Sequence, residues 1–514
     1  MNGAEALMQT ARDAGIDICF ANPGTTEMPL VAAMDRVPGI RAILGLFEGV
    51  CTGAADGYGR MTGRPAMTLL HLGPGFANGI ANLHNARRAR SPIVNLVGDH
   101  TTGHVAFDAP LTSDIVSLAQ PVSGWVRSNT SSAGLPEDFA AAAAAAAGPP
   151  CRVATLIVPA DCQWDPAAGP TEVPEPAAAS TDIARIEAAA GNLRGAAQPM
   201  LLLGGDALRE RGLRAAVRVA SVSGARVLSE TFPARVDRGV GLPPVTRLPY
   251  FPEQAIESLA GVDALVLAGA RDPVAFFGYP NVPSRLAPAD ARVRALTAEG
   301  ENAAAALEQL ADALAAPASA EGPPNPALPA PPADGPLDPA AIGALLARAQ
   351  PADAIIGDEG ATSSLPYTLA ANAAAPHTAL GLTGGAIGQG LPVAVGAAVA
   401  CPDRKVIAIQ ADGSGLYTLQ SLWTLARESL DVTVLICSNR RYRILQVELQ
   451  RAGVALPGPN ADSLTDLSRP DIDWVGLGRS LGVPSARAAT VAALTRELDA
   501  ALAERGPRLI ELVL

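Results

Sequence analysis

The chain has 514 residues, of which 49% are hydrophobic and 17% are charged, and its formal net charge at pH 7 is -12. The chain is too long for a single hydrophobic core, since domains commonly hold about 100 to 150 residues. Its apolar content excludes a disordered or fibrous protein. The acidic balance argues against a nucleic-acid binder, which needs a basic surface, so small molecules are the expected partners.

The amino-terminal segment MNGAEALMQTARDAGIDICF mixes charged residues into a helical pattern and lacks the basic and apolar regions of a signal peptide. No run reaches the roughly 18 apolar residues that a membrane span needs. The 6 cysteines are scattered without CxxC spacing, which argues against a zinc site or a disulfide framework. The sequence therefore predicts a cytoplasmic protein that does not enter a membrane.

Short β-branched runs alternate with longer Ala- and Leu-rich stretches; the runs include RAILGL, PAMTLLHL, SPIVNLVGD, PMLLLGG, DALVLAGA, KVIAIQA and DVTVLICSN. Continuous apolar strands separated by helices predict parallel sheets that are covered on both faces. Two Pro-, Ala- and Gly-rich stretches, at 166–182 and 316–339, are expected to be extended linkers because proline disfavours helices and sheet ladders. The sequence therefore predicts three doubly wound α/β domains, at 1–165, 183–315 and 340–514.

Two polar residues of the first domain directly follow predicted strands. Glu48 comes after AILGLF and opens an Ala- and Gly-rich helix, where its carboxylate is also explained by a favourable interaction with the helix dipole. His71 ends an apolar run and precedes Leu-Gly-Pro-Gly, so its imidazole is expected at the carboxyl end of a strand. In a dry cleft, such an imidazole could donate or accept a proton near neutral pH. The residues alone leave the catalytic and the structural interpretations open.

The middle domain contains PMLLLGGDALRERG and VDALVLAGARDPVAFFGYP, two predicted strands that end in Gly-rich turns. A dinucleotide site is conceivable there, but GGD lacks the spaced GxGxxG fingerprint. Phe276, Phe277 and Tyr279 follow the second strand and suggest an apolar or aromatic ligand, although aromatic clusters more often serve packing.

In the third domain, a lone carboxylate and a lone amide follow two predicted strands. Asp412 comes after KVIAIQA and leads into a helix, and Asn439 ends the run DVTVLICSN, 27 residues later. A helix start with small residues offers free N–H groups to a diphosphate, and Mg²⁺ prefers oxygen ligands of these kinds. Standing alone, Asp412 would be explained as an N-cap and Asn439 as a turn residue. Their spacing favours a shared metal and phosphate site.

The stretch from Asp412 to Asn439 resembles the motif of thiamine-diphosphate-dependent enzymes, in which Gly-Asp-Gly is followed some two dozen residues later by Asn. GLTGGAIGQGLPVAVGAAVACPD at 381–403 is similar to the family's GG-x-G-x-x-LP-AAxG segment. EGVCTGAADGYGRMTG at 48–63 is similar to its E-x-x-A-x-x-A-D-G-Y-A-R-x-T-G segment. The chain thus resembles acetolactate synthase, benzoylformate decarboxylase and pyruvate decarboxylase over its whole length. The resemblance implies pyrimidine-binding, central Rossmann-like and diphosphate-binding domains.

The resemblance assigns cofactor roles to residues of the third domain. Asp412, Asn439 and the carbonyl of Arg441 would hold Mg²⁺ against the diphosphate, and Ile387 would support the bent cofactor. Ala411 replaces the family's first Gly, which is tolerable if the backbone is extended there. The other cofactor contacts that the resemblance implies are Glu359, Gly360, Ala361, Thr362, Gly385, Gly413, Ser414 and Tyr442.

In the first domain, the resemblance assigns Glu48 as the catalytic glutamate, which shares a proton with the aminopyrimidine ring of the cofactor. In this family the two cofactor domains come from different subunits, so a homodimer is the minimum and a homotetramer is common. The arginine-centred motif of relatives that bind FAD is not visible in the middle domain, so FAD is not expected.

The residues near the expected 2-oxo acid substrate favour one branch of the family. CFANPGTTEMPL resembles GNPGSNELP of benzoylformate decarboxylase, and His71 matches that enzyme's histidine, where acetolactate synthases usually carry a small hydroxylic residue. Thr25 would take the place of its active-site serine. Its second histidine, in the middle domain, has no counterpart here, so that proton transfer would use His71, His100 or water. The resemblance also places Asn22, Pro23, Gly24, Phe47 and Asn78 at the cofactor or the cleft.

These patterns predict a thiamine-diphosphate- and Mg²⁺-dependent non-oxidative decarboxylase of a 2-oxo acid. The alternative is an acetolactate synthase-like carboligase, which joins the decarboxylated substrate to a second 2-oxo acid. A more remote alternative is a catalytically silent cofactor-binding paralogue, and the presence of Glu48 argues against it.

Overall fold

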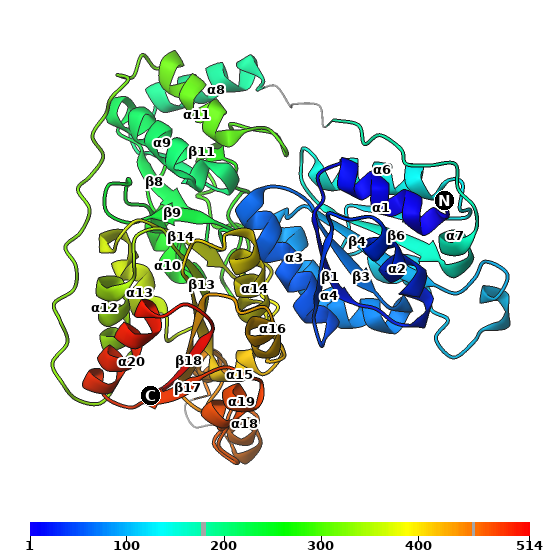
Figure 1. Cartoon of the computed structure of the whole chain (residues 1–514). Helices are drawn as coiled ribbons and strands as arrows, with labels where there is room; N and C mark the ends of the chain where they lie inside the picture. Colours follow the sequence, from blue (N-terminus) through cyan, green and yellow to red (C-terminus); the bar gives the residue numbers. More distant parts are fainter. Residues whose placement is uncertain (176–180, 455–457) are drawn as a thin grey trace. The chain divides into compact units, whose positions relative to one another are not determined.

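The computed structural model describes residues 1–175, 181–454 and 458–514. Contacts divide the chain into two compact units, of which the first comprises Met1–Pro176, Ala330–Thr368 and Leu382–Leu514, and the second Ala177–Pro329 and Leu369–Gly381. Parallel strands with covering helices recur in three sheets, which confirms the predicted α/β architecture (Figure 1). The three domain boundaries stay predictions, because the division by contacts groups the first and third sheets together.

The first sheet has the strand order β2-β1-β3-β4-β6-β5, and all of its neighbouring strands are parallel. Its strands are β1 (Ile18–Asn22), β2 (Arg41–Leu44), β3 (Ala66–Leu70), β4 (Ile93–Asp99), β5 (Trp125–Ser128) and β6 (Val153–Pro159). The strand order reverses between β1 and β3. In open parallel sheets, ligands bind beyond the carboxyl ends of the strands at such a point.

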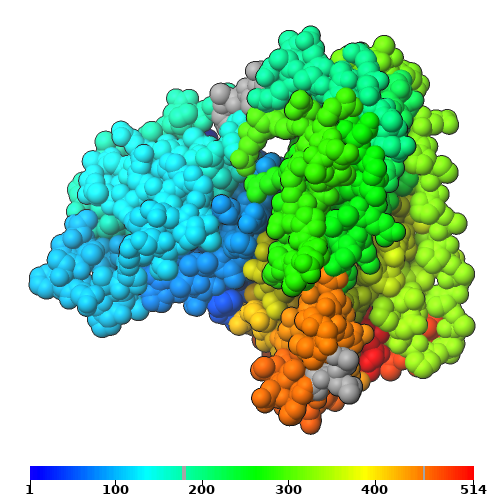
Figure 2. Space-filling view, turned by 180° about the vertical axis from the view of Figure 1, so that it is seen from behind, coloured from blue at the N-terminus to red at the C-terminus, as the bar shows by residue number. Residues whose placement is uncertain are grey.

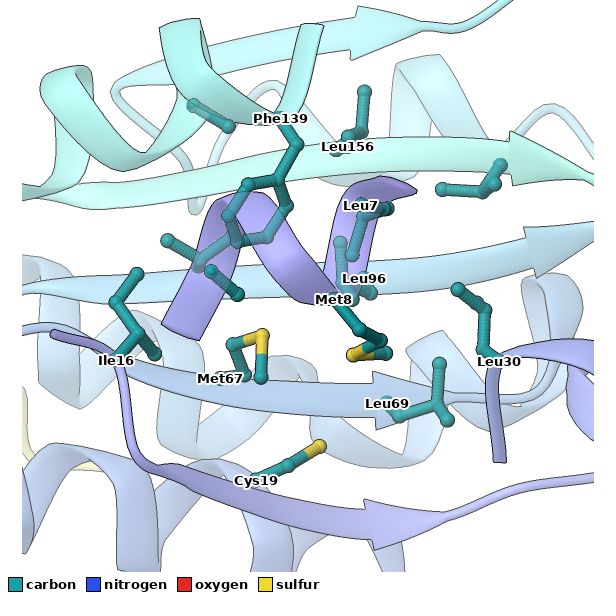
Figure 3. Close-up of a cluster of buried hydrophobic side chains, with 14 of the residues drawn as sticks. Leu7, Met8, Ile16, Cys19, Leu30, Met67, Leu69, Leu96, Phe139 and Leu156 are labelled. Carbon is teal, nitrogen blue, oxygen red and sulfur yellow. The ribbon is translucent and has the colours of Figure 1, made fainter. Parts of the chain in front are cut away.

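Helices cover both faces of the first sheet (Figure 1). One face carries α1 (Gly3–Asp13), α2 (Met28–Arg36), α6 (Leu135–Ala147) and α7 (Ala160–Trp164), and the other carries α3 (Glu48–Thr62), α4 (Leu72–Ala89) and α5 (Ile115–Ala119). Two short 3₁₀ turns, η1 (Thr25–Glu27) and η2 (Val105–Phe107), follow β1 and β4. Leu7 and Met8 of α1 pack with Phe139 of α6 over Met67 and Leu96 of the strands (Figure 3). Burial on both faces explains why these strands are continuously apolar.

The second unit contains a sheet with the strand order β10-β8-β7-β11-β12. Its elements are α8 (Ile183–Arg194), β7 (Pro199–Leu203), η3 (Gly205–Leu208), α9 (Glu210–Ser223), β8 (Arg226–Ser229), β10 (Thr246–Arg247), α10 (Pro252–Leu259), β11 (Ala264–Ala268), β12 (Arg292–Ala295) and α11 (Ala303–Ala313). In the same unit, η4 (Ala371–Ala373) precedes β14 (His377–Gly381), which pairs antiparallel with β9 (Val236–Arg238). Residues 316–338 hold only an isolated bridge at Pro336, as expected of a linker, while the other predicted linker, 166–182, lies partly outside the described residues.

The third sheet, in the first unit, runs in the order β17-β18-β16-β15-β13 with parallel neighbours. Its strands are β13 (Ala354–Glu359), β15 (Val406–Ala411), β16 (Val432–Ser438), β17 (Ser485–Ala488) and β18 (Arg508–Val513). The helices of this region are α12 (Pro339–Ala349), α13 (Leu365–Ala370), α14 (Gly390–Ala400), α15 (Asp412–Gly415), α16 (Ser421–Arg427), α17 (Arg443–Arg451), α18 (Pro459–Ser463), α19 (Trp474–Ser480) and α20 (Val491–Ala503). None of the described helices has the length and apolar character that crossing a bilayer requires.

Helices α3 and α14 approach each other closely because glycines line their contact. A side-chain carbon on Gly57 would overlap the carbonyl group of Val393, and one on Gly53 would lie 2.5 Å from Cβ of Pro392. Without a Cβ, glycine allows the two backbones to come this near. Both helices belong to the segments that resemble the thiamine-diphosphate enzymes.

A buried ionic network joins α3 to the residues just before α14. Asp56 and Arg60 form an ion pair of 2.6 Å, and their side chains are 0% and 2% exposed. Asp56 also accepts hydrogen bonds from Ser91 and from the Gln389 amide. Arg60 donates to the hydroxyl of Thr383 at 3.1 Å. Since buried charges need partners for their remaining polar atoms, this network fixes how α3 meets the segment from 383 to 389.

Replacing Gly57 with alanine is expected to lower the free energy of unfolding by about 1 to 3 kcal/mol, because the added methyl group forces α3 and α14 apart. The matched control is Gly191→Ala in α8, where the methyl group would meet nothing within 4 Å. That change should stabilise its helix by up to about 1 kcal/mol. Thermal unfolding followed by circular dichroism measures both variants. A Gly57→Ala protein as stable as the wild type would contradict the close helix contact.

Candidate active site

The carboxyl ends of four strands bring the predicted residues of the first domain to one edge of the first sheet. The register pairs Asn22 with Leu70 and Ala21 with Leu44, so the segments that follow β1, β2 and β3 start nearly level with one another. The predicted residues along this edge are Asn22 at the end of β1, Pro23, Gly24 and Thr25 after β1, Phe47 and Glu48 after β2, His71 after β3 and His100 after β4.

Glu48 is the first residue of α3 and has only 8% of its surface exposed. Its Oε2 accepts a hydrogen bond of 3.0 Å from the amide of Asn78 in α4. Gly75 lies between Glu48 and His71, since a side-chain carbon there would be 3.1 Å from Oε1 of Glu48 and 3.3 Å from Cβ of His71. The structure thus brings two predicted catalytic residues and Asn78 into one group.

The imidazole of His71 is paired with the carboxylate of Glu27. Nδ1 of His71 lies 2.8 Å from Oε2 of Glu27, whose side chain is 0% exposed, whereas 25% of the His71 side chain is exposed. Glu27 also accepts hydrogen bonds from the backbone N–H of Gly24 at 2.7 Å and from the hydroxyl of Thr26 at 2.5 Å. Three donors therefore surround a carboxylate that has no access to water.

The other two predicted catalytic residues of the first domain have different surroundings. Thr25 is exposed, and it is the hydroxyl of its neighbour Thr26 that lies 3.4 Å from Nδ1 of His71. The Nε2 atom of His100 is buried without a hydrogen-bond partner among the described residues, and its ring meets that of His104 edge-on at 5.3 Å. His100 begins the loop 100–114, sky blue in Figures 1 and 2, which carries the 77% exposed Phe107.

The ends of β13, β15 and β16 bring the predicted metal and phosphate residues to one edge of the third sheet. The register pairs Glu359 with Gln410 and Ala411 with Cys437. Asp412 and Asn439 therefore follow adjacent strands at similar levels. Ala411 has an extended backbone, with φ -76° and ψ 146°, which meets the condition for a methyl group at the family's glycine position.

The oxygens at this edge suit a magnesium ion. Asp412 is buried, burial raises the pKa of its carboxyl, and within the described residues it forms no ion pair. Its two oxygens accept the backbone N–H groups of Gly413 at 2.8 Å and Arg440 at 2.6 Å, and Oδ1 of Asn439 accepts that of Arg441 at 3.1 Å. A divalent cation would offset the cost of burying this carboxylate, and carboxylate, amide and carbonyl oxygens are the ligands it prefers.

No three His, Cys, Asp or Glu side chains gather as metal ligands in the part of the chain that the structure describes. The predicted magnesium set does not need such a cluster, because it uses one carboxylate, one amide and one backbone carbonyl.

A cavity of about 370 Å³ lies at this edge of the third sheet. It is lined by Pro339, Thr362, Ser363, Asn439, Arg441, Arg443 and Leu514, of which Thr362, Asn439 and Arg441 are predicted cofactor or metal residues. Close beside Asp412, a side-chain carbon on Gly413 would lie 2.6 Å from the Tyr442 ring, so the ring rests on the glycine backbone. The structure therefore brings Gly413 and Tyr442, two predicted cofactor residues, into contact.

Glu359 is held by the glycine-rich segment that precedes α14. Its two carboxylate oxygens accept the backbone N–H groups of Gly388 at 2.6 Å and Gly390 at 2.5 Å. Burial raises the pKa of this carboxyl to about 7, against the opposing effect of the two N–H groups. In this structure the Glu359 side chain positions the glycine-rich segment, and its predicted contact with the diphosphate stays a prediction.

The glycine-rich segment 383–390, which contains the predicted Gly385 and Ile387, is also bound by side chains of α4. The Asn85 amide donates to the carbonyl of Ala386 at 2.7 Å, and its Oδ1 accepts the Ala386 N–H at 3.2 Å. Nε2 of His84 lies 3.1 Å from the carbonyl oxygen of Gly384. The segment is thus fixed from the third sheet by Glu359 and from the first sheet by α4.

Three non-glycine residues in the left-handed region stand next to the predicted site residues. They are Leu72 with φ 48°, Ala361 with φ 50° and Arg440 with φ 57°. Each follows a strand end that carries a candidate residue, namely His71, Glu359 or Asn439. Such conformations cost free energy for residues with a Cβ and concentrate at functional sites.

Several residues of this site were not predicted from the sequence, above all Glu27 and Asn85. Glu27 belongs to the stretch CFANPGTTEMPL, but a glutamate at a helix start is also explained by the helix dipole. One feature of the sequence could have indicated it. Glu27 comes three residues after Gly24, so its carboxylate can bond back to the turn after β1, and that turn lies next to the strand that ends at His71. Asn85 lies in the middle of a helix, where nothing in its neighbours indicates a distant partner.

The chain is similar to known proteins over its whole length. The family model described as "Thiamine pyrophosphate enzyme, N-terminal TPP binding domain" matches residues 1–118, and the corresponding C-terminal model matches residues 364–512. A Mycobacterium tuberculosis protein named "Putative acetolactate synthase large subunit IlvX" is 51% identical over 100% of this chain and 99% of its own length. The benzoylformate decarboxylase of Pseudomonas aeruginosa is 30% identical over 98% of this chain and 97% of its own length.

Among solved structures, the thiamine diphosphate-dependent 4-hydroxybenzoylformate decarboxylase of Rhodococcus jostii RHA1 superposes with a TM-score of 0.87. It is 27% identical to this chain, and the match covers 100% of this chain and 99% of that one.

The raised pKa of Glu359 predicts a pH dependence of stability. Its pKa is about 7 when folded and about 4.5 as a model group, so the folded state binds the extra proton between these values. The contribution of Glu359 to the free energy of unfolding is therefore largest below pH 4.5 and falls as the pH rises to 7, by up to about 3 kcal/mol. Urea unfolding across this range measures the pH dependence of the wild type.

The matched variant is Glu359→Gln, which keeps the size of the side chain but cannot titrate. Its stability should change less between pH 4.5 and 7 than that of the wild type. Parallel pH curves for the two proteins would show that Glu359 does not titrate in this window.

Proposed function

The chain belongs to the thiamine pyrophosphate enzyme family, and we propose that it is a non-oxidative decarboxylase that removes carbon dioxide from a 2-oxo acid. The observation that carries this proposal is the group formed by Glu48, His71 and Glu27 at the carboxyl edge of the first sheet. A decarboxylase must put a proton on the carbon that loses carbon dioxide, and His71 is an ionisable group placed beside the catalytic glutamate for that step.

The cofactor proposed is thiamine diphosphate with Mg²⁺. Thiamine diphosphate, when bound, supplies a nucleophilic carbon and an electron sink for cleavage of the bond next to a ketone. Asp412, Asn439 and the carbonyl of Arg441 would hold the metal, and Gly413 and Ser414 beside them would contact the diphosphate. Gly385 and Ile387 would contact the cofactor from a segment that Glu359 and Asn85 already hold in place.

The residues of the first sheet would supply the acid–base chemistry. Glu48 would exchange a proton with the cofactor's aminopyrimidine ring, and the Asn78 amide at 3.0 Å keeps its carboxylate oriented. Because Glu48 is almost fully buried, water does not compete for that proton. His71 would donate the proton that replaces carbon dioxide and could be reprotonated through its exposed part.

The active unit we propose is a homodimer at minimum, with a homotetramer as the common larger form. The support is the family itself, in which the two cofactor domains come from different subunits.

A second candidate is acetolactate synthase-like carboligation, and the name of the relative that is 51% identical favours it. His71 and the stretch from Asn22 to Thr25 favour the decarboxylase, because they match the benzoylformate decarboxylase pattern.

Purified protein with thiamine diphosphate, Mg²⁺ and a panel of 2-oxo acids, including pyruvate and benzoylformate, is expected to release carbon dioxide and form simple aldehydes. Carbon dioxide release and NMR analysis of the products measure this. Acetolactate or mixed acyloins as the main products would transfer the protein to the carboligase class. Absence of turnover with every acid would favour the silent paralogue.

Glu48→Gln is expected to lower kcat by at least about 100-fold, because the amide cannot exchange a proton with the cofactor ring. Binding of thiamine diphosphate, followed by calorimetry, should weaken much less, since the side chain keeps its size and its bond to Asn78. Full activity in this variant would exclude the proposed mechanism.

Asp412→Ala is expected to weaken Mg²⁺-dependent thiamine diphosphate binding by at least about tenfold, because a metal carboxylate ligand is lost. The matched control is Asp403→Ala, which removes an exposed carboxylate just before the amino end of the same strand, β15. Calorimetric titration of both variants with and without Mg²⁺ measures the effect. Equal affinities in the two variants would remove Asp412 from the metal site.

A further inference from the structure

The contact between Glu27 and His71 shows features that surface ion pairs lack. Glu27 is 0% exposed, and each of its oxygens accepts at least one hydrogen bond. A side-chain carbon on Gly98 would overlap the Glu27 carboxylate, so the carboxylate is pressed against the backbone of β4. Removing a carboxylate from water costs free energy. The three donors around Glu27 offset that cost only while their hydrogen bonds to it are maintained.

The imidazole is confined from its other side as well. A side-chain carbon on Gly24 would overlap the His71 ring, so the backbone after β1 lies directly against that ring. Gly75 likewise brings its backbone close to Cβ of His71, because it has no side chain of its own. The ring therefore has little freedom to turn away from Glu27.

The hydrogen bonds also assign the protonated nitrogen of the ring. A carboxylate can only accept, so the Nδ1 atom at 2.8 Å must be the donor. Nε2 is then the nitrogen available to a ligand, since none of the described residues forms a hydrogen bond with it. A quarter of the side chain is exposed, which gives this nitrogen access to the site.

We propose that Glu27 is a positioning residue that fixes the ring orientation and the Nδ1-protonated form of His71, so that Nε2 exchanges protons with the substrate. This role rests on the proposed decarboxylation. A 2-oxo acid anion plus one proton yields an aldehyde and carbon dioxide, and the proton passes from Nε2 of the doubly protonated imidazolium to the carbon that lost carbon dioxide. The imidazole is left neutral with Nδ1–H bound to Glu27, and Nε2 recovers a proton from water.

Two variants separate the charge of Glu27 from its hydrogen bonds. In Glu27→Gln, the amide oxygen can still accept from Gly24 and His71, and the amide nitrogen can face the hydroxyl of Thr26. In Glu27→Leu, no acceptor remains for Nδ1. The matched control is Asn95→Leu on β4, a fully buried side chain whose hydrogen bonds within the described residues are with Thr68 and Thr155.

The test is ¹⁵N NMR of histidine-labelled protein, together with kcat and KM for the best 2-oxo acid. The chain has only 5 histidines, and His71→Asn assigns the signal. In its neutral form, His71 of the wild type and of Glu27→Gln should carry its proton on Nδ1, and Glu27→Leu should shift that proton toward Nε2. We expect kcat to fall about tenfold in Glu27→Gln and at least about 100-fold in Glu27→Leu, with KM changing less than threefold.

The wild-type spectrum tests the hydrogen bond even if Glu27→Leu does not fold. Neutral His71 with Nε2–H in the wild type would overturn the proposal, as would a Glu27→Leu protein that loses no more kcat than Asn95→Leu. If no 2-oxo acid is turned over while the spectra behave as expected, the decarboxylase function fails and the Glu27 to His71 hydrogen bond stands. If turnover occurs and the spectra do not change, the role of Glu27 alone fails.

Discussion

The structure depends on keeping carboxylates buried at the carboxyl ends of parallel strands. Glu27, Glu48, Glu359 and Asp412 all sit there with little or no exposure. Moving an ionised carboxylate out of water costs several kcal/mol of free energy unless hydrogen-bond donors replace the water. Each of these four has its own donors, which are mostly backbone N–H groups or one amide side chain. The turns after the strands are shaped by this requirement.

The donors explain why glycines and strained residues gather in the same places. Gly388 and Gly390 must direct their N–H groups at Glu359, and Gly413 must let the Tyr442 ring come close. Arg440 takes a left-handed conformation and directs its N–H at Asp412. Residues with a Cβ persist in such a conformation only where the surrounding structure holds them in place.

Much of the fold followed from the sequence because its signals are local. Apolar runs separated by helical stretches predicted parallel sheets, and a polar residue directly after a run predicted a strand-end position, as for His71 and Asp412. The resemblance to the thiamine-diphosphate enzymes rested on spacing within single segments. An alanine at position 411 in place of the family's glycine requires an extended backbone, and the structure has one there.

The residues that were missed have partners far away in the chain. Glu27 meets His71 across 44 residues, and Asn85 meets Ala386 across 301 residues. Neither residue differs locally from an ordinary helix-start glutamate or a helix asparagine, so no pattern in the sequence separates them. Thr25 illustrates the opposite limit, because motif position selected it while the hydroxyl near the imidazole belongs to Thr26. The role of Thr25 stays a prediction, and the structure adds Thr26 as a neighbour of the imidazole.

The glycine-rich segment before α14 is held jointly by Glu359 of the third sheet and by Asn85 of the first. Thermodynamic linkage follows from this shared hold. Consider a molecule that binds the segment more tightly when both Glu359 and Asn85 are bonded to it. That molecule must stabilise the docking of α4 onto the segment by the same free energy. For such a molecule, occupancy of the site and docking of α4 onto the segment are coupled equilibria, and a change in one changes the other by the same factor.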